Sequence, residues 1–142
     1  MKRFRIAHVI TRLCRGGAQE NTFHSVRLAN RERYEADLVS GPTFGDEGSI
    51  EDAVRAAGIE IVRVPHLVRR VAPFSDLLAL RELQQLFRTR RYDIVHTHTS
   101  KAGFLGRLAA RQAGVPIVVH TPHGNIFDGY FNRWTTRLFI GM

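Results

Sequence analysis

The segment from Tyr92 to Gly124 constrains the fold more than any other, because it reads as a strand, a helix and a second strand in succession. The first strand is predicted around Ile94 and Val95, and the second over residues 115–119, which are mostly β-branched. Residues 101–113 contain no proline and no β-branched residue, and their apolar side chains recur at helical spacing, which predicts an α-helix. A strand–helix–strand crossover favours two parallel strands joined by a right-handed connection.

The limits of this helix can also be predicted. Ser100 is expected to be its N-cap, because a serine hydroxyl can accept a hydrogen bond from a free backbone N–H. Gly114 suits the left-handed position that follows a last helical turn. Four residues at helical spacing form the predicted buried face: Phe104, Leu105, Leu108 and Ala109.

Polar residues follow each of the two strands at the point where it ends. The first strand runs into His-Thr-His-Thr at positions 96–99, and the second into His-Thr-Pro-His-Gly at positions 120–124. The carboxyl ends of parallel strands meet at one edge of the sheet, where open α/β sheets bind their ligands. Four histidines are therefore expected to converge on a ligand site.

The histidine spacing permits two interpretations, a metal centre or the polar lining of a cleft. Zinc needs three or four ligands with supporting partners, and the nearest carboxylates in the sequence are Asp93 and Asp128. We therefore favour a polar cleft without metal. His96 is expected to be a hydrogen-bonded strand residue, whereas His123 lies in a turn past the strand and is the candidate site residue.

Strands and helices alternate along the rest of the chain. The further predicted strands cover residues 4–11, 34–40 and 59–64, and the further predicted helices cover residues 18–30, 49–57, 75–90 and 133 onward. Ser75 is the expected cap of the third of these helices, whose predicted buried stripe is Leu77, Leu80, Leu83 and Leu86. This alternation predicts one α/β domain over residues 1–142, with a doubly wound, Rossmann-like parallel sheet.

Gly16 and Gly17 stand between the first predicted strand and the first predicted helix. Glycine at this point lets the backbone approach a phosphate closely, and the helix N-terminus presents free N–H groups to it. The full Gly-x-Gly-x-x-Gly fingerprint is missing, so dinucleotide binding of that kind is not supported. A flexible turn is the alternative interpretation of this pair.

The formal net charge of +8 favours anionic partners. Six arginines surround one predicted helix, which makes contact with an anionic membrane credible: Arg69, Arg70, Arg81, Arg88, Arg90 and Arg91. Nucleic acid is not expected, because aromatic residues are not interleaved with the basic ones. Lys101 stands at a helix start, where a cation is disfavoured, so it either meets an anionic ligand or is a solvated surface lysine. Cys14 is the single cysteine, which excludes an intrachain disulfide and favours a reducing cytoplasm.

Three segments together resemble the N-terminal domain of the family 4 retaining glycosyltransferases. They are Gly-Gly-Ala-Gln-Glu at positions 16–20, the run from His96 to Arg107, and His-Thr-Pro-His-Gly at positions 120–124. Proteins of that family have the GT-B fold, in which two Rossmann-like domains face each other across a cleft. The run Ser-Lys-Ala-Gly-Phe-Leu-Gly-Arg is most similar to enzymes of bacterial exopolysaccharide and lipopolysaccharide assembly.

The resemblance implies a role for several residues. Gly16 and Gly17 would meet the diphosphate of a nucleotide-sugar donor, and His123 would lie against the donor sugar at the reaction centre. Gln19, His98 and Lys101 would lie toward the acceptor, a lipid-linked or saccharide molecule. The resemblance also implies metal-independent chemistry without a cofactor, and a cytoplasmic enzyme that can attach peripherally to the inner face of the membrane.

The sequence lacks the pair of glutamates, separated by seven residues, that the C-terminal domain of the family carries. We therefore expect the chain to be the acceptor-side part of a longer enzyme and to be inactive alone. Two alternatives stay open at this point. One is a sugar-nucleotide epimerase of the same fold, which would need Asp93 or Asp128 as acid or base. The other is a non-catalytic module that binds anionic membranes.

Overall fold

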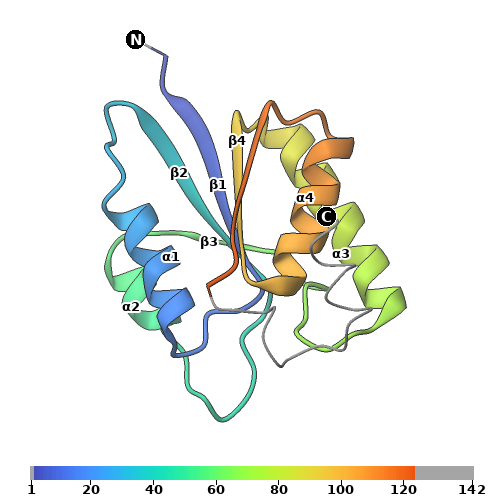
Figure 1. Cartoon of the computed structure of the whole chain (residues 1–142). Coiled ribbons are helices and arrows are strands. Elements are labelled where there is room, and N and C mark those ends of the chain that lie inside the picture. Colours follow the sequence, from blue (N-terminus) through green and yellow to red (C-terminus); the bar gives the residue numbers. More distant parts are fainter. Residues whose placement is uncertain (1, 124–142) are drawn as a thin grey trace.

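The computed structural model describes residues 2–123 and shows five strands in one parallel sheet, in the order β3-β2-β1-β4-β5 (Figure 1). The strands are β1 (Phe4–Ile10), β2 (Tyr34–Ser40), β3 (Ile61–Arg63), β4 (Ile94–His98) and β5 (Ile117–Thr121). The helices are α1 (Gly17–Arg27), α2 (Glu51–Ala56), α3 (Pro73–Arg90) and α4 (Ser100–Gln112). The doubly wound parallel sheet predicted from the sequence is therefore confirmed. The predicted helix from residue 133 onward lies outside the described residues.

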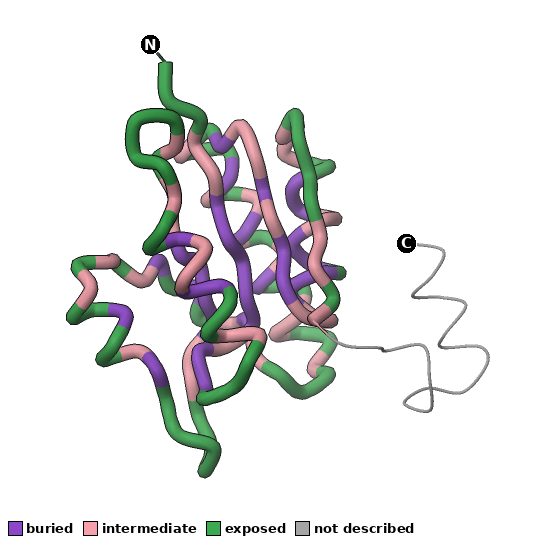
Figure 2. The backbone as a smooth tube through the Cα atoms, turned by 60° about the vertical axis from the view of Figure 1, so that its left-hand side comes forward, coloured by how far each residue is buried: buried purple, intermediate pink, exposed green. Residues whose placement is uncertain are grey.

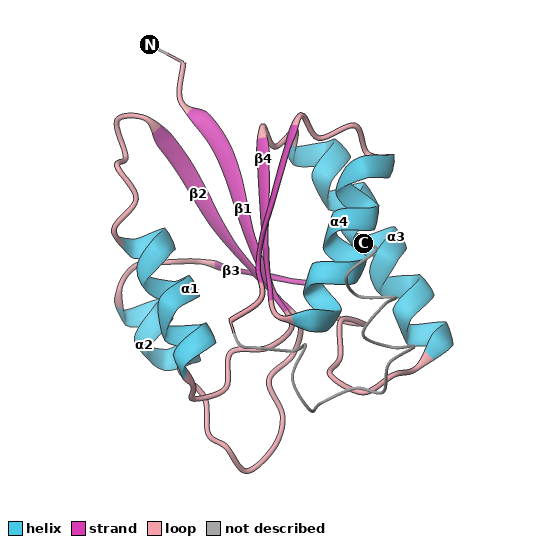
Figure 3. Ribbon diagram, viewed as in Figure 1, coloured by secondary structure: helices cyan, strands magenta, loops and turns pink. Residues whose placement is uncertain are grey.

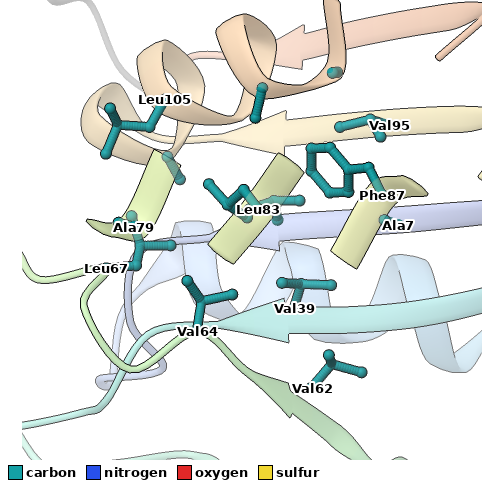
Figure 4. Packing of buried hydrophobic residues seen from close by; sticks show 14 of the residues in the cluster. Ala7, Val39, Val62, Val64, Leu67, Ala79, Leu83, Phe87, Val95 and Leu105 are labelled. Atoms are coloured by element: carbon teal, nitrogen blue, oxygen red, sulfur yellow. The ribbon is translucent and has the colours of Figure 1, made fainter. Parts of the chain in front are cut away.

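Helices cover both faces of the sheet (Figure 3). The helices α3 and α4 pack over one face, where Leu83, Phe87 and Leu105 meet Ala7 and Val95 of the central strands (Figure 4). The helices α1 and α2 pack over the other face in a second cluster: Ile10, Leu13, Phe23, Val26, Leu38, Ile50 and Val54. The direction in which successive strands are added reverses between β1 and β4, and this switch point is where such sheets bind ligands.

The N-terminus of α4 differs from its prediction. Thr99, not Ser100, is the N-cap, and its φ of 67° lies in the left-handed region. No side chain of its own segment caps the helix. Instead, the Thr11 hydroxyl accepts a hydrogen bond from the backbone N–H of Ala102 at 3.2 Å. Because Thr11 directly follows β1, the sheet itself supplies the capping oxygen, which local sequence cannot reveal.

The helix α3 also departs from its prediction. It begins at Pro73 rather than after Ser75, because proline suits the first turn of a helix. The Asp76 carboxylate accepts a hydrogen bond from the N–H of Ala72 at 3.3 Å. The buried face is Ala79, Leu83 and Phe87, with Leu80 and Leu86 partly buried. Leu77 of the predicted stripe is exposed, and so is Phe104 of the predicted α4 face.

The ends of three other elements move from their predicted places. The helix α1 ends at Arg27 rather than Asn30, and β3 is limited to Ile61–Arg63. The strand β5 begins two residues later than predicted, at Ile117, and continues to Thr121. His120 and Thr121 therefore still pair with β4, at Thr97 and His98, and the chain leaves the sheet only after them.

Two glycines let α4 lie close to the sheet. A Cβ on Gly106 would come within 2.6 Å of the Thr97 methyl, and one on Gly103 would come within 2.4 Å of the His120 ring. Both distances are shorter than side chains tolerate. The close approach of α4 therefore depends on glycine, and it places the helix start directly above the carboxyl ends of β1 and β4.

Candidate functional site at the carboxyl edge of the sheet

Three histidines of the two central strands lie together. In the parallel pairing of β1 with β4, His8 stands opposite His96, and His98 lies two residues further along β4. His8 is 5% exposed and His98 is 1% exposed. The sequence pattern predicted His96 and His98 here but missed His8, whose only signal is that it is a polar residue within an apolar strand.

The turn after β5 brings His123 to this group. His123 has a φ of 57°, a left-handed conformation that histidine adopts more readily than most residues. Its Nε2 lies 2.7 Å from Nδ1 of His98, and Nε2 of His98 lies 3.1 Å from Nδ1 of His8. The predicted site residues His98 and His123 are therefore in contact, through a row of hydrogen-bonded imidazoles that begins at His8.

The other two histidines bind threonines across the β4–β5 pair. His96 Nε2 lies 2.7 Å from the Thr121 hydroxyl, and His120 Nδ1 lies 2.9 Å from the Thr97 hydroxyl. His96 is thus a hydrogen-bonded strand residue, as predicted. Its ring also stacks on that of His98, with centroids 4.2 Å apart.

Burial keeps these imidazoles neutral near pH 7, because a buried ring loses the hydration that favours its charged form. It lowers the pKa of His8 to about 4 and that of His98 to about 2, with the neighbouring histidines as the smaller cause. The pKa values of His96, His120 and His123 are also lowered, mainly by burial. Each ring therefore carries one N–H donor and one acceptor nitrogen.

The nearest nitrogens of His8, His96 and His98 lie within 4.8 Å of one another, a spacing that metal ligands can have. However, the rings of His96 and His98 are stacked, and stacked imidazoles do not direct their nitrogens at a common ion. The nitrogens joining His8 to His98 are already hydrogen-bonded to each other. That the site works without metal stays a prediction.

The glycine pair lies at the N-terminus of α1. Gly16 is the N-cap, in an extended conformation, and no side chain caps the helix. A Cβ on Gly16 would lie 2.6 Å from the Gln19 amide oxygen, so Gln19 folds over Gly16. A Cβ on Gly17 would meet no atom within 4 Å, which leaves its backbone open to a ligand.

Lys101 lies between α4 and α3. Its ammonium group donates to the Asp76 carboxylate at 2.6 Å and to the Arg70 carbonyl oxygen. The side chain is 13% exposed, so it is not the solvated surface lysine considered above. Asp76 is an anion within the chain that offsets the unfavourable position of Lys101 at a helix start.

An exposed apolar surface lies beside Lys101, around the start of α3. We call it the α3 patch, and it consists of Val71, Phe74, Leu77 and Leu78, which are 85%, 87%, 47% and 41% exposed. Arg69 and Arg70 precede it and are exposed, and Arg69 also forms an exposed ion pair with Glu47 at 3.6 Å. Arg90, in contrast, binds Asp37 at 3.0 Å, so it does not belong to a free basic face. Among residues 2–123, no helix has the length and apolarity needed to cross a bilayer.

A family model described as a glycosyl transferase 4-like domain matches residues 6–141. The chain belongs to this glycosyltransferase family. The match takes in nearly the whole sequence, including the glycine pair and all the histidines described above. It confirms the resemblance that the three sequence segments indicated.

A relative from Escherichia coli is 40% identical over 126 residues, which are 89% of this chain and 31% of the relative. It is named UDP-Gal:alpha-D-GlcNAc-diphosphoundecaprenol alpha-1,3-galactosyltransferase. The chain spans about a third of the length of the curated relatives that it matches.

Solved structures show the same fold at low sequence identity. A protein from Anabaena, in complex with UDP and glucose, has a TM-score of 0.70 and 19% identity, over 97% of this chain and 35% of that one. The UDP-GlcNAc 2-epimerase from Neisseria meningitidis, bound to UDP-GlcNAc, has a TM-score of 0.64 and 14% identity, over 96% of this chain and 38% of that one.

Proposed function

We propose that this chain is the acceptor-side domain of a retaining glycosyltransferase. The whole enzyme would transfer a sugar from a nucleotide-sugar to a lipid-linked or polysaccharide acceptor. One observation carries the proposal beyond family membership: His123 stands past the end of β5 and is held by His98 at 2.7 Å. The Escherichia coli relative supports a UDP-sugar donor and an acceptor linked to a polyprenyl diphosphate.

The proposed chemistry needs groups that act where charge develops. Breaking the bond between sugar and diphosphate builds positive charge on the sugar and negative charge on the leaving group. Neutral His123 can hydrogen-bond a sugar hydroxyl with one nitrogen while His98 holds the other. The open backbone of Gly17, at the free N-terminus of α1, can receive the diphosphate. Such preorganised groups stabilise a transition state without needing a metal.

The proposed acceptor side is formed by Gln19, His98 and Lys101. Gln19 lies over Gly16, beside the proposed diphosphate site. Lys101 is held in place by Asp76. His98 is 1% exposed, so its influence on the acceptor has to pass through His123 rather than through direct contact.

We also propose that the α3 patch and Arg69 and Arg70 bring the enzyme to the inner face of the membrane, where a lipid-linked acceptor resides. Exposed apolar side chains can enter the headgroup region while basic ones bind anionic lipids. The patch lies beside Lys101, which belongs to the proposed acceptor side.

The position of Asp93 excludes it as one of the two candidate acid or base residues of the epimerase alternative. Asp93 accepts a hydrogen bond from the backbone N–H of Arg5 at 2.8 Å, at the amino ends of β1 and β4. That is the opposite edge of the sheet from the histidines, so Asp93 is not an acid or base for a ligand there. Asp128, the other carboxylate, lies outside the described residues.

The experiment compares His123→Ala with His96→Ala in the full-length enzyme, using initial rates of sugar transfer and thermal midpoints. We expect His123→Ala to lower turnover by roughly a hundredfold or more, because losing one preorganised group commonly costs about 3 kcal/mol. His96→Ala should act mainly as a packing change. The assignment of His123 is wrong if its variant keeps near-normal rates, or loses activity only because it unfolds.

A further inference from the structure

We propose that Lys101 and Asp76 are positioning residues, whose ion pair joins the starts of α4 and α3 and holds the α3 patch at the carboxyl edge of the sheet. The inference deepens the proposed function and rests on it for the ligand, a lipid-linked acceptor. It starts from two contacts of the Lys101 ammonium group, which donates to the Asp76 carboxylate at 2.6 Å and to the carbonyl oxygen of Arg70.

Lys101 extends from a helix start that the sheet holds in place. The helices α3 and α4 pack side by side (Figure 1), and each follows a strand of the parallel sheet, so both begin near its carboxyl edge. Thr99, the N-cap of α4, donates its N–H to the carbonyl oxygen of Thr121 in β5 at 3.3 Å. Thr11, after β1, caps the same helix. Lys101 therefore has a fixed base, close after His98 of the candidate site.

The segment that precedes α3 has few other attachments. Residues 69–71 are all exposed. Within the described part of the chain, their polar contacts are the ion pair of Arg69 with Glu47 at 3.6 Å and the bond from Lys101 to the Arg70 carbonyl oxygen. Exposed ion pairs contribute little to stability. The bond from Lys101 is therefore the contact that restrains this segment.

Asp76 links Lys101 to the first turn of α3. One of its carboxylate oxygens accepts from Lys101, and the other accepts from the N–H of Ala72 at 3.3 Å. An anion is favourable in the first turn of α3, and it offsets the unfavourable cation in the first turn of α4. The Asp76 and Lys101 side chains are only 22% and 13% exposed, which limits screening by salt. The pair therefore fixes the first turn of α3, and with it Phe74 and Leu77 of the α3 patch, relative to α4.

This geometry gives Lys101 a role on the acceptor side without contact with the acceptor. Its ammonium group already donates to two oxygens of the chain and is largely covered, so it offers little to a ligand. Its effect is to keep the α3 patch in one place relative to His98 and His123. A lipid-linked acceptor that binds through the patch then meets an ordered surface, and less binding free energy is lost in ordering it.

Limited trypsin digestion tests the structural part, because trypsin attacks the carbonyl group of arginine and the Arg70 carbonyl is the one that Lys101 binds. Lys101→Met should speed cleavage after Arg70 by roughly tenfold, the effect of losing a hydrogen bond from a charged group. Asp76→Asn should speed it by a smaller factor. Asp52→Asn is the matched control, since Asp52 lies in the first turn of α2 and is fully exposed. Cleavage no faster in Lys101→Met than in this control overturns the proposal.

A double-mutant cycle shows whether the two residues act as a pair. If Asp76 acts by holding Lys101, the double variant Lys101→Met with Asp76→Asn should be cleaved after Arg70 no faster than Lys101→Met alone. Residues that act separately give effects on the logarithm of the rate that add. Additive effects would therefore overturn the proposal.

The KM for a lipid-linked acceptor, measured with the full-length enzyme, gives the second readout. Lys101→Met and Asp76→Asn should both raise it by roughly threefold to tenfold, the effect of a surface segment that is ordered only on binding. The KM for the nucleotide-sugar donor should not change. If Lys101 instead touched the acceptor, Asp76→Asn would free its ammonium group and leave the acceptor KM unchanged or lower it, which overturns the proposal.

The two readouts also separate this inference from the proposed function. If cleavage changes as expected but the full-length enzyme transfers no sugar to a lipid-linked acceptor, the proposed function fails, and the ion pair still holds the α3 patch. If the enzyme uses such an acceptor but cleavage after Arg70 is the same in all variants, only the positioning role is wrong.

Discussion

His8 and His98 are histidines that the fold buries in neutral form, and this has a consequence for stability against acid. The unfolded chain takes up a proton on His8 near its ordinary pKa of 6.5, whereas the folded chain does so only near 4. Between these values the unfolded state binds more protons, so the free energy of unfolding falls as the pH is lowered from about 6.5 to about 4. Above pH 6.5 this contribution is complete.

The measurement is urea unfolding at a series of pH values between 7 and the acid limit of the folded protein. A single neutral buried imidazole contributes a slope of about 1.4 kcal/mol per pH unit. His8→Phe should make the slope shallower by about one proton. An identical slope in this variant would contradict the assignment of the acid sensitivity to His8.

Tyr92 provides a residue-scale prediction away from the site. Its hydroxyl donates to the Asp37 carboxylate at 2.6 Å, and burial, followed by Asp37, raises the pKa of Tyr92 so that the donor proton stays in place. Tyr92→Phe should lower the free energy of unfolding by about 2 kcal/mol, as expected for a buried bond to a charged group.

Tyr34→Phe is the matched control, measured in the same urea experiment. The Tyr34 hydroxyl has no hydrogen bond to residues 2–123, and its ring lies against Phe4. The control should therefore change stability by less than about 0.5 kcal/mol. Equal changes in both variants would mean that the bond to Asp37 does not stabilise the fold.

At the scale of elements, the close packing of α4 on β4 predicts that Gly106→Ala lowers stability in the natural sequence but raises it in a second background. Gly106→Ala would drive a methyl group to within 2.6 Å of the Thr97 methyl, which is fully buried. We expect a loss of about 1–3 kcal/mol from overpacking. Thr97→Ser removes the colliding methyl and keeps the hydroxyl that bonds His120.

In the Thr97→Ser background, Gly106→Ala should instead stabilise the protein, because alanine is favoured over glycine in a helix by about 1 kcal/mol. Thermal or urea unfolding of the four proteins in this cycle measures both effects. A loss of the same size in both backgrounds would show that the collision with Thr97 is not the cause.

The elements also show what sequence could and could not predict. The order of strands and helices follows from local pattern, because apolar periodicity and glycine positions are local. The cap of α4 does not, since its oxygen comes from Thr11, 91 residues away from Ala102. His8 was missed for the same reason: its partners belong to β4, and only the register of β1 on β4 brings them together. The placements of His98 beside His123 and of Gln19 over Gly16 agree with the predicted site, but their roles stay predictions.

At the scale of the whole molecule, charge and apolar exposure gather at the start of α3. We expect salt-sensitive binding to anionic vesicles, with each basic residue near the surface worth about 1 kcal/mol before screening. Phe74→Ser should weaken binding in a vesicle sedimentation assay. Leu28→Ser is the control. Leu28 is 71% exposed but lies at the C-terminal end of α1, on the opposite face of the sheet from α3. Equal binding to neutral and anionic vesicles at low salt would contradict the role of the arginines.

The length of the relatives motivates a further prediction about the molecule as a whole. The 142-residue chain corresponds to about a third of them. We expect it to transfer no sugar by itself, because catalysis in a cleft needs both walls to orient the reactants. Incubation with nucleotide-sugar and acceptor, followed by product analysis, measures this. Robust turnover would contradict the proposal that this chain supplies only the acceptor side of the enzyme.

The strand β5 is the outer strand of the described sheet, and its residues Ile117, Val118 and Val119 are exposed. Figure 2 shows this edge strand in green over its first part. A protein is made from its N-terminus at roughly 5–20 residues per second, and finished parts fold while later parts are still being added. Once Thr121 has left the ribosome, the nascent chain therefore displays an open, apolar strand, the kind of surface that pairs with other chains. Copies of this chain made close together on one messenger RNA should thus be most prone to aggregate through β5.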